Sequence, residues 1–168
     1  MNSSSSSTPA FSSSSFAQSR FVFLRGLALV YFCAFASNWV QWPGLFGWDG
    51  IKPAEGLLRR KGAASYAEFP TFALWASDLG LQVDTLLEVN CLLGMVLSSL
   101  AFLAAPTTAV FAGLWLSYLS LFVVGETFLS FQWDILLLET GVLAALWAPL
   151  LPRSPAWAQV IPTVFLFL

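Results

Sequence analysis

The chain has 168 residues, of which 58% are hydrophobic and 10% charged, and its mean hydropathy is +0.77. This balance excludes an ordinary soluble domain, because so few charges cannot solvate the surface of so apolar a chain. The formal charge of −2 without a dense basic patch excludes a nucleic-acid partner, and the absence of histidine excludes Ser-His and Cys-His nucleophiles and the HExxH zinc site.

The N-terminal segment 1–20 is dominated by serine, and we expect a disordered tail there because it cannot bury enough apolar surface to fold. Residues 21–42 are apolar over a length that crosses a bilayer core, which needs about 20 residues. Two alternatives stay open for this end of the chain, a transit peptide and a cleaved signal peptide. Arg25 inside the apolar run, and the apolar character that continues through Trp39 and Trp42, favour an uncleaved span.

Residues 43–82 are rich in Gly and Pro and carry most of the charge, which predicts an extramembrane loop. Within it, GLLRRKGAASYAEF (56–69) mixes basic and apolar residues as segments that lie along a membrane surface do. FALWASDLGL (72–81) has a similar composition and is too short to span.

Two further spans are expected at about 83–105 and 107–124, with a tight turn between them at Pro106. Small residues recur four places apart in these spans and in the next, and such spacing lets another helix approach closely. We therefore expect helix packing at Gly94, Ser98, Ala109, Gly113, Ser117, Gly141 and Ala145.

A fourth span is expected at 134–151, before Pro152, and the apolar segment 157–168 begins a fifth. Because 12 helical residues cover only about 18 Å, we expect the chain to end inside that fifth span. The predicted fold class is therefore all-α, a polytopic transmembrane helical bundle of about four spans plus a truncated fifth. In this division of the chain, the transmembrane domain occupies 21–168.

Arginines indicate how the bundle is oriented. Arg20, Arg25 and Arg153 fall on one side after an even number of crossings, and the positive-inside rule assigns that side to the cytosol. The loop 43–82 and the short segment 125–133 then face the opposite compartment.

Two carboxylates lie in the apolar stretch FLSFQWDILLLETG, 128–141. Asp134 follows Trp133 at the expected interface, where it is expected to cap the fourth helix. Glu139 lies about 7.5 Å deeper along the axis, beyond the reach of capping. A charged carboxylate in lipid costs about 2.5–3.5 kcal/mol, so we expect Glu139 to point into the bundle.

Two interpretations of Glu139 stay open. It is either a buried polar latch that fixes helix register or part of an acidic vestibule for a cation or proton, with Asp84, Glu88 and Glu126 near the same face. A paired acid and base at Asp134 and Glu139 is not expected, because five residues rotate a helix by about 140° beyond full turns.

The stretch 128–141 closely resembles the most recognisable part of the lipase maturation factors. AFASNWVQWPGLFGWDGIKPAEGLL, EFPTFALWASDLGL and LWLSYLSLFVVGETFLSFQWD resemble the same family in the same order. The resemblance covers about 21–152 and is nearer the second of the two vertebrate paralogues.

This resemblance implies a multi-pass membrane protein of the endoplasmic reticulum that helps secreted client lipases fold and assemble into active dimers, without being an enzyme. Family members continue into a large lumenal region, so the resemblance implies a truncated form. Motif or structural positions carried over without individual roles are Gly44, Gly50, Pro53, Trp133, Asp134, Leu137, Leu138, Glu139, Thr140 and Gly141.

The sequence leaves one alternative function, a small proton- or ion-coupled transport subunit that uses Glu139 with Asp84 or Glu88. A membrane enzyme is a weaker hypothesis, because no metal cluster or nucleotide loop is recognisable, and no cofactor is expected. The expected partners are the lipid bilayer and, by resemblance, client lipases.

Overall fold

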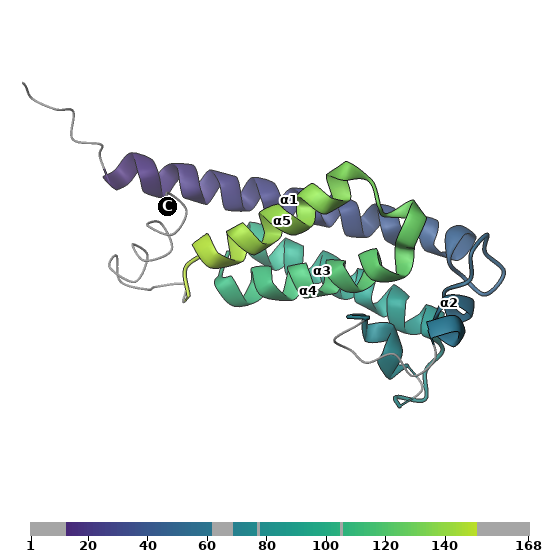
Figure 1. The fold of residues 1–168 in the computed structure, drawn as a ribbon. Coiled ribbons are helices and arrows are strands. Elements are labelled where there is room, and N and C mark those ends of the chain that lie inside the picture. Colours follow the sequence, from purple (N-terminus) through teal and green to yellow (C-terminus); the bar gives the residue numbers. More distant parts are fainter. Residues whose placement is uncertain (1–12, 62–68, 77, 105, 151–168) are drawn as a thin grey trace, which may run out of the picture.

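Over the described residues, the fold is a bundle of four long helices with three short helices at one end (Figure 1). The computed structural model describes residues 13–61, 69–76, 78–104 and 106–150, and contains no strand in those ranges. The helices are α1 (Ser13–Leu45), α2 (Ala54–Lys61), η1 (Phe72–Trp75), α3 (Val83–Leu103), α4 (Thr108–Gly125), η2 (Glu126–Phe128) and α5 (Gln132–Trp147). The predicted all-α membrane fold is confirmed.

Successive long helices run in opposite directions (Figure 1). α1 packs mainly against α3, α3 against α4, and α4 against α5, while contacts between α1 and α5 close the bundle. The loop that contains α2 and η1 and the α4–α5 connection therefore lie at the same end, as the sequence predicted.

Within the described part of the chain, three helices are long and apolar enough to cross a membrane, by length and composition only. These candidate spans are Ala17–Leu45, Val83–Leu103 and Thr108–Phe128. α5 has 16 residues and covers about 24 Å, less than the roughly 30 Å of a hydrocarbon core. A fourth helix is present where we expected a fourth span, whereas a full fourth crossing stays a prediction.

α5 ends earlier than the predicted 151 because of Pro149. The residue before a proline is disfavoured in the helical region, and Ala148 is extended, with φ −66° and ψ 152°. Beyond the helix, the Thr108 N–H donates to the Pro149 carbonyl at 3.0 Å, and Thr108 Oγ1 donates to the Ala148 carbonyl at 2.9 Å. The chain after α5 thus returns to the level of the first residue of α4.

The N-terminal helix begins earlier than expected. α1 starts at Ser13, so residues 13–20, which we assigned to a disordered tail, are helical. Extending an existing helix adds one hydrogen bond for each residue fixed, so even serine-rich sequence can continue it. Residues 1–12 and the predicted fifth span, 157–168, lie outside the described residues.

An aromatic cluster fills the middle of the bundle. The ring centroids of Tyr31 and Phe35 of α1 lie 5.9 and 5.5 Å from that of Tyr118 of α4, both in edge-on geometry. A Cβ on Gly94 would overlap the Phe35 ring, and a Cβ on Gly141 would overlap the Tyr31 hydroxyl. These two glycines therefore sit at close approaches between helices, as their spacing predicted.

The other small residues follow the prediction unevenly. Ser98 and Ser117 are buried, and Gly113 and Ala145 are partly buried. Ala109 is exposed, so its assignment to a packing face is wrong. Each step of four residues rotates about 40° beyond a full turn, and two steps carry Ala109 about 80° away from Ser117.

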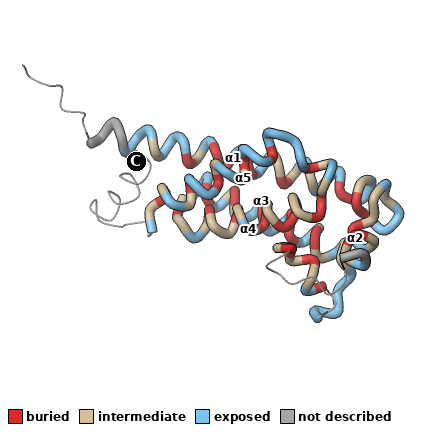
Figure 2. Tube along the Cα trace, viewed as in Figure 1, coloured by how far each residue is buried: buried red, intermediate tan, exposed pale blue. Residues whose placement is uncertain are grey.

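Exposed residues lie along the outside of the bundle (Figure 2), and many of them are large and apolar. They include Leu29 of α1, Val96 of α3, Leu116 of α4 and Leu136 of α5, all exposed. Because lipid tails are as apolar as these side chains, such an exterior suits a bilayer rather than water.

Candidate functional site: the loop cap of the bundle

The end of the bundle that carries α2 and η1 is the most elaborated surface of the protein. We call it the loop cap and define it as the described residues of 46–82 together with 126–131. The sequence predicted a hydrophilic loop here, but the cap is folded onto the helix ends: Ala54, Leu57, Phe69, Thr71 and Ala73 are buried.

The first part of the cap is a tight return of the chain onto the last turn of α1. The Ile51 N–H donates to the Gly44 carbonyl at 3.1 Å, and the Lys52 N–H donates to the Leu45 carbonyl at 2.8 Å. A Cβ on Gly50 would lie 2.9 Å from the Leu45 carbonyl carbon, so only glycine fits there. Pro53 directly precedes α2, and its carbonyl accepts the Gly56 N–H at 3.1 Å. These contacts give Gly44, Gly50 and Pro53 a shared structural role.

An ion pair joins this return to the α4–α5 connection. Lys52 Nζ donates to Glu126 Oε2, and both side chains are about one-third exposed, at 35% and 34%. Glu126 has a φ of 38°, a backbone conformation that is strained for a residue with a Cβ. The pair therefore lies where the chain leaves α4 in an unfavourable geometry.

Buried hydroxyls hold the second part of the cap. Thr71 Oγ1 donates to the Ser120 carbonyl at 3.1 Å and lies 3.0 Å from Ser120 Oγ. Ser120 Oγ also accepts the Phe72 N–H at 2.9 Å, and Thr71 Oγ1 accepts the Ala73 N–H at 3.2 Å. These hydroxyl oxygens accept hydrogen bonds from the backbone N–H groups at the start of η1, which have no water to bond inside the protein.

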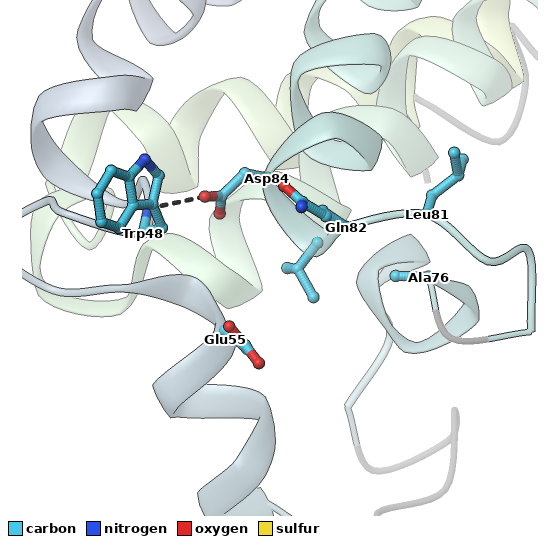
Figure 3. Close-up of a pocket in the computed structure, with 7 residues that line it drawn as sticks. Trp48, Glu55, Ala76, Leu81, Gln82 and Asp84 are labelled. Atoms are coloured by element: carbon cyan, nitrogen blue, oxygen red, sulfur yellow. Dashed lines mark hydrogen bonds between the residues drawn. The ribbon is translucent and has the colours of Figure 1, made fainter.

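Between the two parts of the cap lies an open pocket of about 650 Å³ (Figure 3). The Trp48 N–H donates to Asp84 Oδ2 at 2.7 Å across one side of it. Glu55 lines another side and accepts two hydrogen bonds from Arg59 of the next helical turn. The remaining lining residues are Ala76, Leu81, Gln82 and Val83.

Apolar side chains project from the cap around this pocket. Trp48 and Ile51 are 82% and 76% exposed, and Trp75, Leu79 and Leu81 are also exposed. Aromatic side chains presented in this way are typical anchors for a partner protein or for the membrane interface.

Asp134 is not the N-cap residue of α5, but it lies in the first turn and its carboxylate accepts a backbone hydrogen bond at Phe131, as the capping prediction in part required. The residue at the N-cap position is Phe131, and its own side chain makes no capping hydrogen bond. Asp134 is also buried, and its Oδ1 accepts a 2.6 Å hydrogen bond from the Tyr118 hydroxyl. The buried polar latch that we assigned to Glu139 is thus supplied by Asp134.

Glu139 does not point into the bundle, and that prediction is also wrong. Its side chain is exposed on the outer face of α5, as expected for a residue rotated about 140° from the buried Asp134. The described residues contain no group of three or more His, Cys, Asp or Glu able to hold a metal ion. Asp84 is bonded to Trp48 and Glu126 to Lys52, so the predicted acidic vestibule does not assemble.

The remaining motif residues of α5 have distinct surroundings. Trp133 is exposed and stacks on Phe131 with centroids 4.7 Å apart. Leu137 is buried and its carbonyl accepts the Tyr31 hydroxyl at 3.2 Å, while Leu138 packs against the core. Thr140 Oγ1 donates to the carbonyl of Leu136 within the same helix.

Sequence reasoning missed the hydroxyl residues Tyr31, Thr71 and Ser120. Their signal was a hydroxyl in an apolar setting, which needs a partner when buried. The partners lie 106 and 49 residues away along the chain, so their identity required the fold.

Comparisons with known proteins agree with the sequence resemblance. Residues 18–168 match the lipase maturation factor transmembrane domain. Lipase maturation factor 2 of Gallus gallus is 47% identical over 82% of this chain and 20% of its own length. Lipase maturation factor 2 of Homo sapiens is 46% identical over 80% of this chain and 20% of its own length. Lipase maturation factor 1 of Bos taurus is 37% identical over 84% of this chain and 28% of its own length.

No solved structure matches this chain. The chain spans about a fifth of the length of the lipase maturation factor 2 relatives. Because the family model covers nearly the whole chain and the fold is a bundle of apolar helices, this chain belongs to the lipase maturation factor family.

Proposed function

We propose that this chain is the membrane portion of an endoplasmic-reticulum factor that assists the folding and assembly of secreted dimeric lipases, without catalysing a reaction. The observation that carries the proposal is the family match over 18–168, in a family named for lipase maturation. The predicted division of the chain, with 21–168 as one transmembrane domain, is part of this proposal.

The loop cap is the part of the chain that we assign to the client. Its exposed Trp48 and Ile51 offer apolar anchors beside an open pocket, and a client segment that has not finished folding exposes apolar side chains. The carboxylates of Asp49 and Asp78 are exposed on the same cap and favour basic residues that flank such a segment.

The experiment is coexpression of this chain with a secreted lipase in cells that lack their own maturation factors, with secreted lipase activity as the readout. Trp48→Ala should lower the gain in activity severalfold. The matched control is Trp39→Ala, which removes another exposed tryptophan that does not line the pocket.

Equal activity with both variants would remove the cap from the mechanism. A wild-type chain that binds no lipase and raises no lipase activity would overturn the proposed function for this chain. The transport alternative has less support, because Glu139 faces outward, away from the helix contacts of the bundle.

A further inference from the structure

Glu139 lies at the middle height of the bundle. It stands between Leu137, whose carbonyl accepts the Tyr31 hydroxyl, and Gly141, which closely approaches the same hydroxyl. Tyr31 is the midpoint of the candidate span Ala17–Leu45. If the bundle crosses a bilayer, Glu139 is therefore near its centre.

The Glu139 carboxyl has no partner within the described part of the chain. It is exposed, and the hydrogen bonds and ion pairs of the described residues do not include it. A charged carboxylate there costs about 2.5–3.5 kcal/mol, and a neutral carboxyl still leaves a donor and an acceptor facing lipid. An outward carboxyl at this depth therefore requires a polar partner on the outside of the bundle.

The residues around Glu139 have the spacing of a helix-packing seam. α5 faces inward along Asp134, Leu137, Gly141, Ala144 and Ala148. Its outer face repeats the same alternating spacing of three and four residues, and all its members are exposed: Ile135, Glu139, Val142 and Leu146. Such spacing keeps one stripe of a helix against a neighbouring helix. We call this stripe the outer seam.

We propose that the outer seam of α5 is the interface of a symmetric dimer of this chain, in which the two Glu139 carboxyl groups hydrogen-bond to each other. Two copies inserted in the same orientation are related by an axis along the membrane normal, so residues of the same number lie at the same depth. A carboxyl is self-complementary, because its neutral form both donates and accepts a hydrogen bond.

The Glu139 of a second copy is a better partner for this carboxyl than a basic residue of the same sequence. Arg20 and Arg25 lie in the first part of α1, and Lys52 and Arg59 lie in the loop cap, so these cations sit toward the two ends of the bundle. The remaining apolar sequence, 157–168, carries no charged residue. The Glu139 of a second copy offers a polar group at the required depth by symmetry.

The test is disulfide crosslinking of the full chain in phosphatidylcholine vesicles, in a Cys33→Ala background that removes the exposed native thiol. Val142→Cys, on the outer seam, should give a crosslinked dimer. Val96→Cys is the matched control, since it is exposed on α3 and should remain monomeric. Crosslinking at both positions, or at neither, would overturn the proposal.

The role of the carboxyl is tested by two substitutions in the Val142→Cys chain. Glu139→Gln keeps a self-complementary donor and acceptor and should retain the dimer. Glu139→Leu should weaken dimerisation about three- to tenfold, the range expected when an interhelical hydrogen bond in lipid is lost.

Leucine at this exposed position suits lipid, so the Glu139→Leu chain should fold, and circular dichroism with single-molecule photobleaching would verify helicity and copy number. A Glu139→Leu chain that dimerises as strongly as Glu139→Gln would sink the idea.

Discussion

At the scale of single residues, the structure exchanges the roles that we expected for the two carboxylates of α5. Asp134 is buried against Tyr118, and Glu139 is exposed. Both follow from their places on the helix, because the inward stripe passes through Asp134 and misses Glu139. The aromatic cluster then determines which small residues cannot be replaced by larger ones. Gly141 has the least space for an added Cβ.

The Asp134–Tyr118 bond should contribute measurably to stability. Tyr118→Phe removes the donor and leaves the buried carboxyl without it, so the free energy of unfolding should fall by about 1–3 kcal/mol. Steric trapping in micelles would measure this change. Asp134→Asn is the companion variant, since its amide oxygen can still accept from Tyr118, and it should lose less. An unchanged stability of Tyr118→Phe would contradict this account.

Gly141→Ala should destabilise the bundle by about 1–3 kcal/mol, because its Cβ displaces the Tyr31 hydroxyl from the Leu137 carbonyl. The same steric-trapping measurement applies. Gly26→Ala is the control, with nothing within 4 Å of the added carbon, and should be close to neutral. Adding Tyr31→Phe should reduce the penalty of Gly141→Ala by making room, and a full penalty in that double variant would argue for another cause.

At the scale of elements, the loop cap is attached to the bundle by a few specific contacts. The return after α1 is held by backbone bonds and by Lys52 with Glu126, while η1 is held by Thr71 on Ser120. The ion pair is partly exposed and contributes little on its own, typically about 0–1 kcal/mol. The buried hydroxyl pair of Thr71 and Ser120 therefore contributes more than the ion pair to the attachment of the cap.

Thr71→Val keeps the shape of the side chain but removes its hydroxyl. The three hydrogen bonds of Thr71 Oγ1 are lost, so the segment 69–76 should open more often, with amide hydrogen exchange about tenfold faster. Mass spectrometry of peptides from this segment would detect it. Thr127→Val, on an exposed threonine, should leave the exchange unchanged. Equal rates in both variants would mean that packing of Phe69 and Ala73 holds the cap alone.

At the scale of the whole molecule, the two ends of the bundle have different chemistry. One end carries the loop cap with its pocket and exposed tryptophans, and the other carries the α3–α4 turn and the start of α1. Arg20 and Arg25 belong to the second end and favour it as the cytosolic end, whereas Lys52 and Arg59 in the cap count against this, so the orientation stays a prediction.

Cysteine labelling in sealed endoplasmic-reticulum vesicles tests this orientation. In the Cys33→Ala background, Asp78→Cys in the cap should react with an impermeant maleimide only after permeabilisation. Ala104→Cys, exposed at the opposite end, should react in intact vesicles. The reverse labelling pattern would mean that the bundle has the opposite orientation and that the cap faces the cytosol.

The sequence by itself determined the membrane environment, the order of the long helices that the structure describes, and the family. These follow from composition and from apolar runs, which are local properties. It also located the close approaches at Gly94 and Gly141, because small residues four apart favour them. It placed the end of α1 too early, near 42, because helix propagation beyond the apolar run left no sign in hydropathy.

Only the tertiary structure decided which side chains face one another. Whether Asp134 or Glu139 turned inward depended on the rotation of α5 against α4 and α1, and the partners of Thr71 and Tyr31 are distant in the chain. A helix of nearly uniform apolarity has no strong amphipathic stripe to fix its rotation in advance. The physical reason is that packing in lipid is selected by shape and hydrogen bonds between helices, not by hydrophobicity.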